Sequence, residues 1–261
     1  DNQSCQQTFL ASDTIFIEDF AVDIVKSVGM LCDSGLVQVS TSITSISPLS
    51  FTQWTYGPSS TTSTNNILNL NITTPGVYPI NLTASNAACT RTAIDSIVVY
   101  HSPKANYGIT PLQACVPQMV QFTDSATVVN DSIVAYIWDL GNGVIDSVAN
   151  TSYLYDTVAS YNVQYKVIAG SGCVDSSQAT VDIFALPIAN AGNDTIICEG
   201  QSVSLLATGG GAAYAWNASA SLSCTNCPNP TASPTQTTDY IVTVTNINGC
   251  TDIDTVTVMV N

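Results

Sequence analysis

Seven of the nine cysteines of this chain, all except Cys224 and Cys227, recur at nearly constant intervals. One series has a spacing of 83 positions and consists of Cys32, Cys115 and Cys198. The other has spacings of 84, 84 and 77 positions and consists of Cys5, Cys89, Cys173 and Cys250. One tryptophan lies in each interval, at Trp54, Trp138 and Trp216. This regularity predicts a tandem array whose unit is about 80 residues long.

The repeat sets the domain boundaries. Cys5 has the position of a second cysteine, so residues 1–20 are interpreted as the last strand of a preceding repeat. Three repeats follow at 21–101, 102–186 and 187–261. The joins are short and contain proline, which favours extended, stiff connections. We therefore expect the chain to be a piece of a longer protein made of such repeats.

Within each repeat the residue pattern is that of short strands. The third repeat alternates at 239–245 and 254–260, with a turn at 246–249 between them. Glu occurs only twice and Lys plus Arg only 4 times, although these residues normally fill helix surfaces. The sequence predicts an all-β fold of tandem Ig-like antiparallel sandwiches placed end to end.

The second repeat contains Trp138-Asp-Leu-Gly-Asn-Gly143, followed by Tyr161-Asn-Val163. These residues resemble the PKD (polycystic kidney disease) domain signature, W-D-F-G-D-G and later G-x-Y-x-V. The first repeat keeps Trp54 and Pro75-Gly-Val-Tyr78, and the third keeps Ala189-Asn-Ala-Gly192. Both depart from the W-D-x-G pattern, so their resemblance rests mainly on register. The match covers nearly the whole chain and implies PKD-like, Ig-like domains.

The paired cysteines and the stretch 222–230 are similar to PKD-type repeats of large Bacteroidota surface proteins, commonly exported by type IX secretion. This resemblance implies a non-enzymatic, extracellular structural or adhesive segment of a surface fibre or giant adhesin, used in gliding, attachment or cell capture. The alternatives are an accessory region of a secreted polysaccharide- or protein-degrading enzyme, and a glycan-binding module. Expected partners are adjacent repeats of the same chain, other copies in a filament, and a cell-surface or glycan receptor.

Charge and residue content argue against several function classes. The net charge of -15 repels phosphate, so nucleic acid is a poor partner. No run of about 18 apolar residues is present to span a membrane. The only histidine, His101, lies in a join between repeats. The sequence therefore does not support a Ser-His-Asp catalytic triad, and no enzyme activity is expected. Nine cysteines in a β-rich chain indicate an oxidising, extracytoplasmic compartment.

The pairing of the cysteines remains open at this stage. Pairing within each repeat would join Cys32 to Cys89, Cys115 to Cys173 and Cys198 to Cys250. In an Ig-like sandwich, however, the first turn and the last hairpin lie at opposite poles, about 20 Å apart, whereas a disulfide needs Cα atoms within about 7 Å. This argument favours pairing between neighbouring repeats, Cys32 with Cys173 and Cys115 with Cys250, and leaves Cys5, Cys89 and Cys198 for partners outside the segment. An irregular first strand would instead permit pairing within each repeat.

Metal and cofactor sites have little support. Cys224-Thr-Asn-Cys227 could supply two zinc ligands, but no second pair accompanies it, so a local disulfide is expected. Calcium is the more credible ion, and its candidate ligands are Asn190, Asn193 and Asp194 near a join. No other cofactor is expected.

Asp followed by Ser or Thr and a small or apolar residue occurs eight times, similar to the O-glycosylation acceptor of Bacteroidota. The candidate acceptors are Thr14, Ser96, Ser125, Ser132, Ser147, Thr157, Thr195 and Thr255. The competing interpretation is that Asp ends a turn before a strand. The three Trp side chains could form a carbohydrate platform, but their fixed register favours a place in each core.

Overall fold

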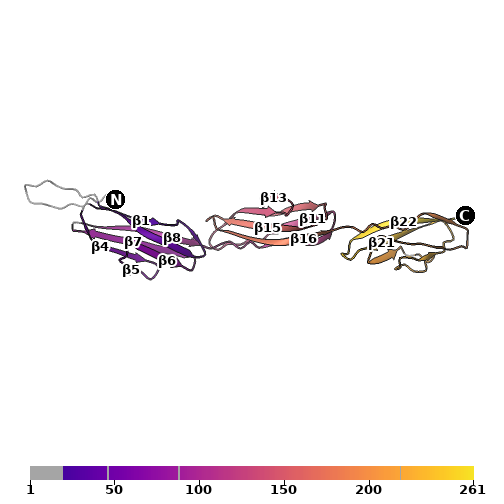
Figure 1. Cartoon of the computed structure of the whole chain (residues 1–261), viewed down its shortest axis with the longest axis horizontal. Helices are drawn as coiled ribbons and strands as arrows, with labels where there is room; N and C mark the ends of the chain where they lie inside the picture. Colours follow the sequence, from indigo (N-terminus) through magenta and orange to yellow (C-terminus); the bar gives the residue numbers. More distant parts are fainter. Residues whose placement is uncertain (1–19, 46, 88, 218) are drawn as a thin grey trace, which may run out of the picture. The chain divides into compact units, whose positions relative to one another are not determined.

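The computed structural model describes residues 20–45, 47–87, 89–217 and 219–261. The described residues form an all-β protein of tandem β-sandwiches, as the sequence predicts (Figure 1). By their contacts they fall into two compact units. Unit 1 holds the described residues of Asp1–Ala105, Ala126–Tyr136 and Lys166–Ser176, and unit 2 holds those of Asn106–Ser125, Ile137–Tyr165 and Ser177–Asn261.

The first sandwich is built from two sheets, with strand orders β1-β3-β6 and β2-β8-β7-β4-β5. Its strands are β1 (Ala21–Lys26), β2 (Leu31–Cys32), β3 (Gly35–Thr44), β4 (Leu49–Tyr56), β5 (Thr61–Ser63), β6 (Ile67–Ile72), β7 (Gly76–Asn86) and β8 (Thr90–Tyr100). Alternate side chains of β3 and β7 are buried, because successive residues of a strand point to opposite faces of the sheet. The core includes Trp54, Ile80 and Leu82.

The second sandwich repeats this plan, with strand orders β14-β11-β9 and β10-β16-β15-β12-β13. Its strands are β9 (Tyr107–Thr110), β10 (Gln113–Cys115), β11 (Gln118–Asp124), β12 (Ile133–Asp139), β13 (Ile145–Asp146), β14 (Thr151–Tyr155), β15 (Ala159–Ala169) and β16 (Val174–Phe184). An aromatic cluster fills its core, where Trp138 stacks on Tyr165 with ring centroids 4.0 Å apart.

The third sandwich has one four-stranded sheet, β17-β22-β21-β19, and a two-stranded sheet, β18-β20. Its strands are β17 (Thr195–Ile197), β18 (Val203–Ser204), β19 (Ala213–Trp216), β20 (Thr231–Ala232), β21 (Thr238–Thr245) and β22 (Thr251–Val260). Trp216, Tyr240 and Val242 belong to its core. In this sandwich, loops take the place of several strands that are present in the other two.

The strand pairing differs from the expectation in one respect. The sequence indicates antiparallel sheets, and most pairs are antiparallel, but each sandwich also contains one short parallel pair. In each case the strand at the first repeat cysteine runs alongside the last strand of the same sandwich: β2 with β8, β10 with β16, and β17 with β22. This pairing determines where the cysteines lie.

Residues 1–19 lie outside the described residues, and with them the interpretation of 1–20 as a preceding strand, apart from the buried Phe20. The predicted repeats at 21–101, 102–186 and 187–261 enclose the three groups of strands. Among the described residues there is no helix with the length and hydrophobicity needed to cross a lipid bilayer.

Candidate functional site

The parallel pairs place the two cysteines of a repeat at opposite ends of its last strand. In the first sandwich, Cys32 lies opposite Tyr100, whereas Cys89 directly precedes Thr90 at the start of the same strand. Eleven residues of extended chain span about 36 Å. A disulfide requires Cα atoms about 5–6 Å apart, so pairing within this repeat is geometrically excluded.

The third sandwich has the same geometry. Ile197, which directly precedes Cys198, pairs with Val260 at the end of β22, and Cys250 directly precedes Thr251 at its start. Ten residues of extended chain again span about 33 Å. The second sandwich repeats the register, with Cys115 opposite Phe184.

The disulfides therefore connect neighbouring sandwiches. Cys32 is bonded to Cys173, with Cα atoms 5.8 Å apart, and Cys115 is bonded to Cys250, with Cα atoms 5.6 Å apart. This is the inter-repeat pairing that the argument from opposite poles favours. Cys173 and Cys250 are each 1% exposed, so the half-cystines at the hairpin turns are shielded from solvent.

Apart from the Cys224–Cys227 pair, two cysteines among the described residues take no part in these two bonds. Cys198 is an exposed free thiol at the position equivalent to Cys32 and Cys115. Cys89 is disulfide-bonded, so the expectation that it is left for a partner outside this segment is wrong. Cys5 lies outside the described residues.

Aspartates accept hydrogen bonds from the chain that enters each of the later repeats. Asp175, two positions after Cys173, accepts a bond from the N–H of Ala105 at 2.9 Å. Asp252, two positions after Cys250, accepts the equivalent bond from Ala189, also at 2.9 Å. A bond with a charged acceptor is about twice as strong as a neutral one. The Cys-x-Asp pattern that marks these bonds is visible in the sequence, although the sequence analysis did not use it.

The first join carries further contacts beside its disulfide. Asp33 has a φ of 61° and accepts a hydrogen bond from the N–H of Ser102 at 2.9 Å. That bond holds the pKa of the Asp33 carboxyl below its ordinary value. Gly172, next to Cys173, has a φ of 85°, and a side chain there would meet Met30 Cε at 3.3 Å. The turn thus favours glycine for both conformation and close approach.

The second join uses an asparagine. Asn246 donates from Nδ2 to the carbonyl oxygen of Ala185 at 2.9 Å, and its Oδ1 accepts from the N–H of Cys250 at 3.0 Å. One side chain therefore connects the hairpin turn that carries Cys250 to the end of the preceding repeat.

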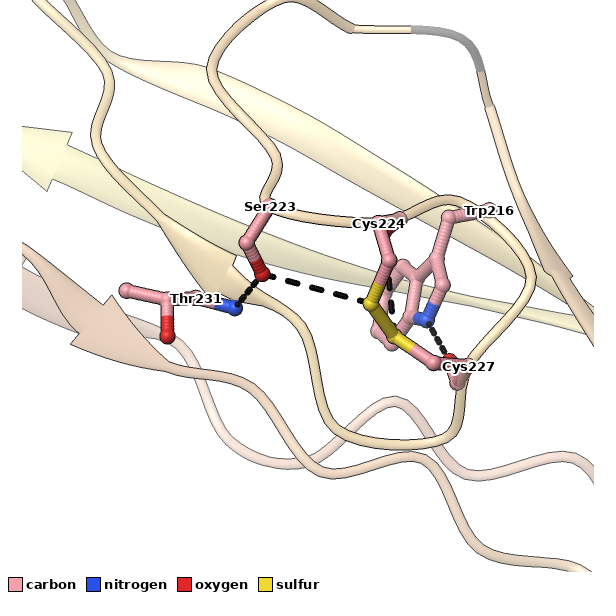
Figure 2. The surroundings of a disulfide bond; sticks show 5 residues. All are labelled: Trp216, Ser223, Cys224, Cys227 and Thr231. Carbon is pink, nitrogen blue, oxygen red and sulfur yellow. Dashed lines mark hydrogen bonds between the residues drawn. A yellow bond between two sulfur atoms is a disulfide. The ribbon is translucent and has the colours of Figure 1, made fainter.

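The predicted local disulfide between Cys224 and Cys227 is present, and Figure 2 shows its surroundings. The indole N–H of Trp216 donates to the carbonyl oxygen of Cys227 at 2.9 Å. The indole N–H groups of Trp54 and Trp138 likewise donate to the carbonyl oxygen eleven positions later, at Asn65 and Ala149. In the first two sandwiches a short hairpin strand, β5 or β13, lies between donor and acceptor. In the third, the disulfide loop positions the acceptor instead.

The tryptophans lie in the cores and not on a carbohydrate platform. Trp54 and Trp138 are 0% exposed and Trp216 is 4% exposed. An indole ring without exposed surface cannot stack on a sugar. Any ligand of these sandwiches has to use other side chains.

The structure gives local roles to the calcium candidates. Asn190 Oδ1 accepts from the N–H of Gly192 at 2.8 Å, and Asp194 Oδ1 accepts from the N–H of Thr257 at 2.8 Å, while Asn193 is exposed. The described residues contain no group of three or more His, Cys, Asp or Glu side chains arranged to hold a metal. Calcium binding stays a prediction.

His101 lines a cavity of about 460 Å³ at the first join, together with Asp33, Lys104 and Asp175. Both carboxylates there accept hydrogen bonds from backbone N–H groups, as described above. These hydrogen bonds position the backbone of the join.

The candidate glycosylation sites differ in accessibility. The exposed acceptors are Ser125, Ser132, Ser147, Thr157 and Thr255. The half-buried acceptors are Ser96 and Thr195. Thr14 lies outside the described residues. In three motifs the Asp accepts a hydrogen bond at 2.7 Å from the N–H of the next residue, at Asp95, Asp131 and Asp146. A turn role thus accounts for these aspartates, and glycosylation stays a prediction.

Comparison with known proteins supports a PKD-like repeat in the middle of the chain. A family model described as "PKD domain" matches residues 100–185. This segment is PKD-like. A comparison with curated proteins finds no significant match.

Solved structures of multidomain Ig proteins share the sandwich fold with this chain. Titin domains I67–I69, in an E-to-A mutated variant, align over 91% of this chain and 98% of their own, with 11% identity and a TM-score of 0.50. The N-terminal eight Ig domains of Down syndrome cell adhesion molecule cover 89% of this chain, with 35% of their own length, 12% identity and a TM-score of 0.50. The PKD1 domain of Vibrio anguillarum Epp covers 33% of this chain and 98% of its own, with 22% identity and a TM-score of 0.30.

Proposed function

We propose that this segment is a non-enzymatic structural and adhesive part of an extracellular surface fibre or giant adhesin, in which disulfides between repeats resist pulling. The supporting observation is that two disulfides join successive sandwiches, Cys32 to Cys173 and Cys115 to Cys250. Bonds between repeats limit how far the chain can be extended. Ig-like and PKD-like domains generally serve as structural or adhesive modules, and disulfides are typical of oxidising compartments.

The array continues beyond these three sandwiches in this proposal. Cys198 is exposed and free at the position where Cys32 and Cys115 form inter-repeat bonds. Its partner would be the second-position cysteine of a following repeat in the longer chain. The resemblance to Bacteroidota surface proteins supports a cell-surface location and export by type IX secretion. The exposed Asp-Ser and Asp-Thr motifs would carry glycans there, and intact-mass analysis of the secreted protein tests that part.

The test compares cells carrying the native parent protein with cells in which four cysteines of that protein are replaced by Ser: Cys32, Cys115, Cys173 and Cys250. We expect equal surface display and equal attachment at rest, but faster detachment of the variant under flow. A matched control replaces Cys224 and Cys227, whose bond lies within one sandwich. Unchanged detachment of the four-cysteine variant would contradict the proposal. Loss of an enzyme activity of the parent protein when residues 21–261 are deleted, with attachment intact, would favour the accessory role.

A further inference from the structure

The first sandwich contains a pocket that the sequence analysis did not anticipate. It has a volume of about 340 Å³ and lies where the turn after β4 faces the edge strand β6. Its lining includes Tyr56, Gly57, Asn69, Asn71, Ile72 and Tyr78. This volume is at the lower end of the range of small-molecule sites, about 300–1,000 Å³.

A comparison with the second sandwich explains why the pocket is there. Val37 pairs with Leu70 and Val120 pairs with Tyr153, so Leu70 corresponds to Tyr153 and Ile72 to Tyr155. Tyr155 is 1% exposed and its hydroxyl donates to the carbonyl oxygen of Leu140 at 2.8 Å.

The second sandwich fills this region with rings. Tyr155 packs against Tyr153 and Tyr161, with centroids 5.0 and 4.3 Å apart. The first sandwich has the smaller Leu70 and Ile72 at the corresponding positions of β6. The first sandwich also has Tyr56 where the second has Leu140, two positions after the equivalent tryptophan. The pocket is thus bordered by aliphatic side chains of β6 and by a tyrosine at the end of β4.

The lining combines aromatic, aliphatic and polar side chains and is uncharged. None of its residues is Asp, Glu, Lys, Arg or His, in a chain whose net charge is -15. Tyr78 donates its hydroxyl proton to the carbonyl oxygen of Thr74 at 2.7 Å, which fixes the position of its ring. Asn71 is exposed, and its side chain has no hydrogen-bond partner among the described residues.

We propose that this pocket binds a pyranose ring of a neutral glycan. A pyranose has an apolar face, which suits the tyrosine rings, and hydroxyls around its rim, which suit amides and hydroxyls such as those of Asn71 and Ser59. The negative charge of the protein disfavours sugars with carboxylates. A site that takes one or two rings with few hydrogen bonds binds weakly, with a Kd on the order of 1 mM.

The test uses the full 261-residue chain and ligand-observed NMR titrations with four soluble hexasaccharides. Three are neutral, built from glucose, mannose or N-acetylglucosamine, and the fourth is the acidic hexamer of galacturonic acid. We expect saturable binding of at least one neutral oligosaccharide and no binding of the acidic one. Tyr56→Ala should weaken the binding about tenfold or more, because it removes a ring that lines the pocket.

Two further variants control for folding. Asn71→Ala changes an exposed side chain and should weaken binding several-fold without loss of thermal stability. Phe51→Ala removes an exposed aromatic ring from the same strand as Tyr56, outside the pocket, and should bind like the parent. Absence of saturable binding by every neutral hexasaccharide overturns the proposal, as does binding that survives both Tyr56→Ala and Asn71→Ala. Neither result bears on the disulfides, so the proposal stands or falls separately from the mechanical role.

Discussion

The two inter-repeat disulfides predict how far the unfolded chain can be pulled. With both bonds intact, the shortest covalent path runs from residue 1 to Cys32, across to Cys173, back along the chain to Cys115 and across to Cys250. That path has about 100 residue steps, or about 350 Å at ~3.5 Å per step, whereas the reduced chain has about 260 steps and ~910 Å. Reduction should therefore add about 560 Å of contour length.

Optical-tweezer unfolding with handles at the two ends measures this length. Cys5 and Cys89 are both replaced by Ser, because the bond at Cys89 would otherwise alter the path. In this background, a further Cys32→Ser/Cys173→Ser variant leaves only Cys115–Cys250, and the path becomes about 125 steps, or ~440 Å.

Pairing within the repeats gives a different length for that variant. Only a bond from Cys198 to Cys250 would remain, and the path would have about 208 steps, or ~730 Å. A contour length near this larger value would refute the pairing and the register argument behind it. The Cys224–Cys227 bond leaves these lengths unchanged, because residues 224–227 lie inside the loop that the bond to Cys250 closes in either pairing.

Three smaller changes test the local interactions. Replacing Cys224 and Cys227 by Ser should lower the free energy of unfolding of the third sandwich by about 2 kcal/mol, because the unfolded chain regains the entropy of a loop of this size. Denaturant titration of tryptophan fluorescence measures this change, with Cys198→Ser as the neutral control. Tyr155→Phe should cost about 1–2 kcal/mol by calorimetry, because a buried carbonyl loses its hydrogen bond, and an unchanged melting temperature would contradict this. Hydrogen bonds from the side chain and the backbone N–H of Ser171, and from the backbone N–H of Ser132, lower the pKa of Asp131. Its stabilising effect is therefore present above the unfolded-state pKa of about 3.9 and is lost as the pH falls through the lower folded-state pKa. The melting temperature should therefore drop more steeply below pH 4 in the parent than in Asp131→Asn, and parallel curves would refute this.

Much of the architecture follows from the sequence because its signals are local or periodic. Alternating apolar residues mark strands such as β21 and β22, and the Gly249 turn between them is a short-range signal. The spacing of Cys32, Cys115 and Cys198 identifies the repeat without any knowledge of contacts. The same periodicity places one tryptophan in each core.

The sequence by itself also favoured disulfides between repeats over disulfides within a repeat. A strand has a fixed length, and the first turn and last hairpin of a sandwich lie at opposite ends of it. The parallel pairing of β2, β10 and β17 decided between the two, and that pairing depends on contacts between residues more than 60 positions apart. The pocket beside Tyr56 is also a tertiary feature. Its lining comes from β4, β6 and β7, which belong to two sheets, so it depends on side chains that are far apart in the sequence.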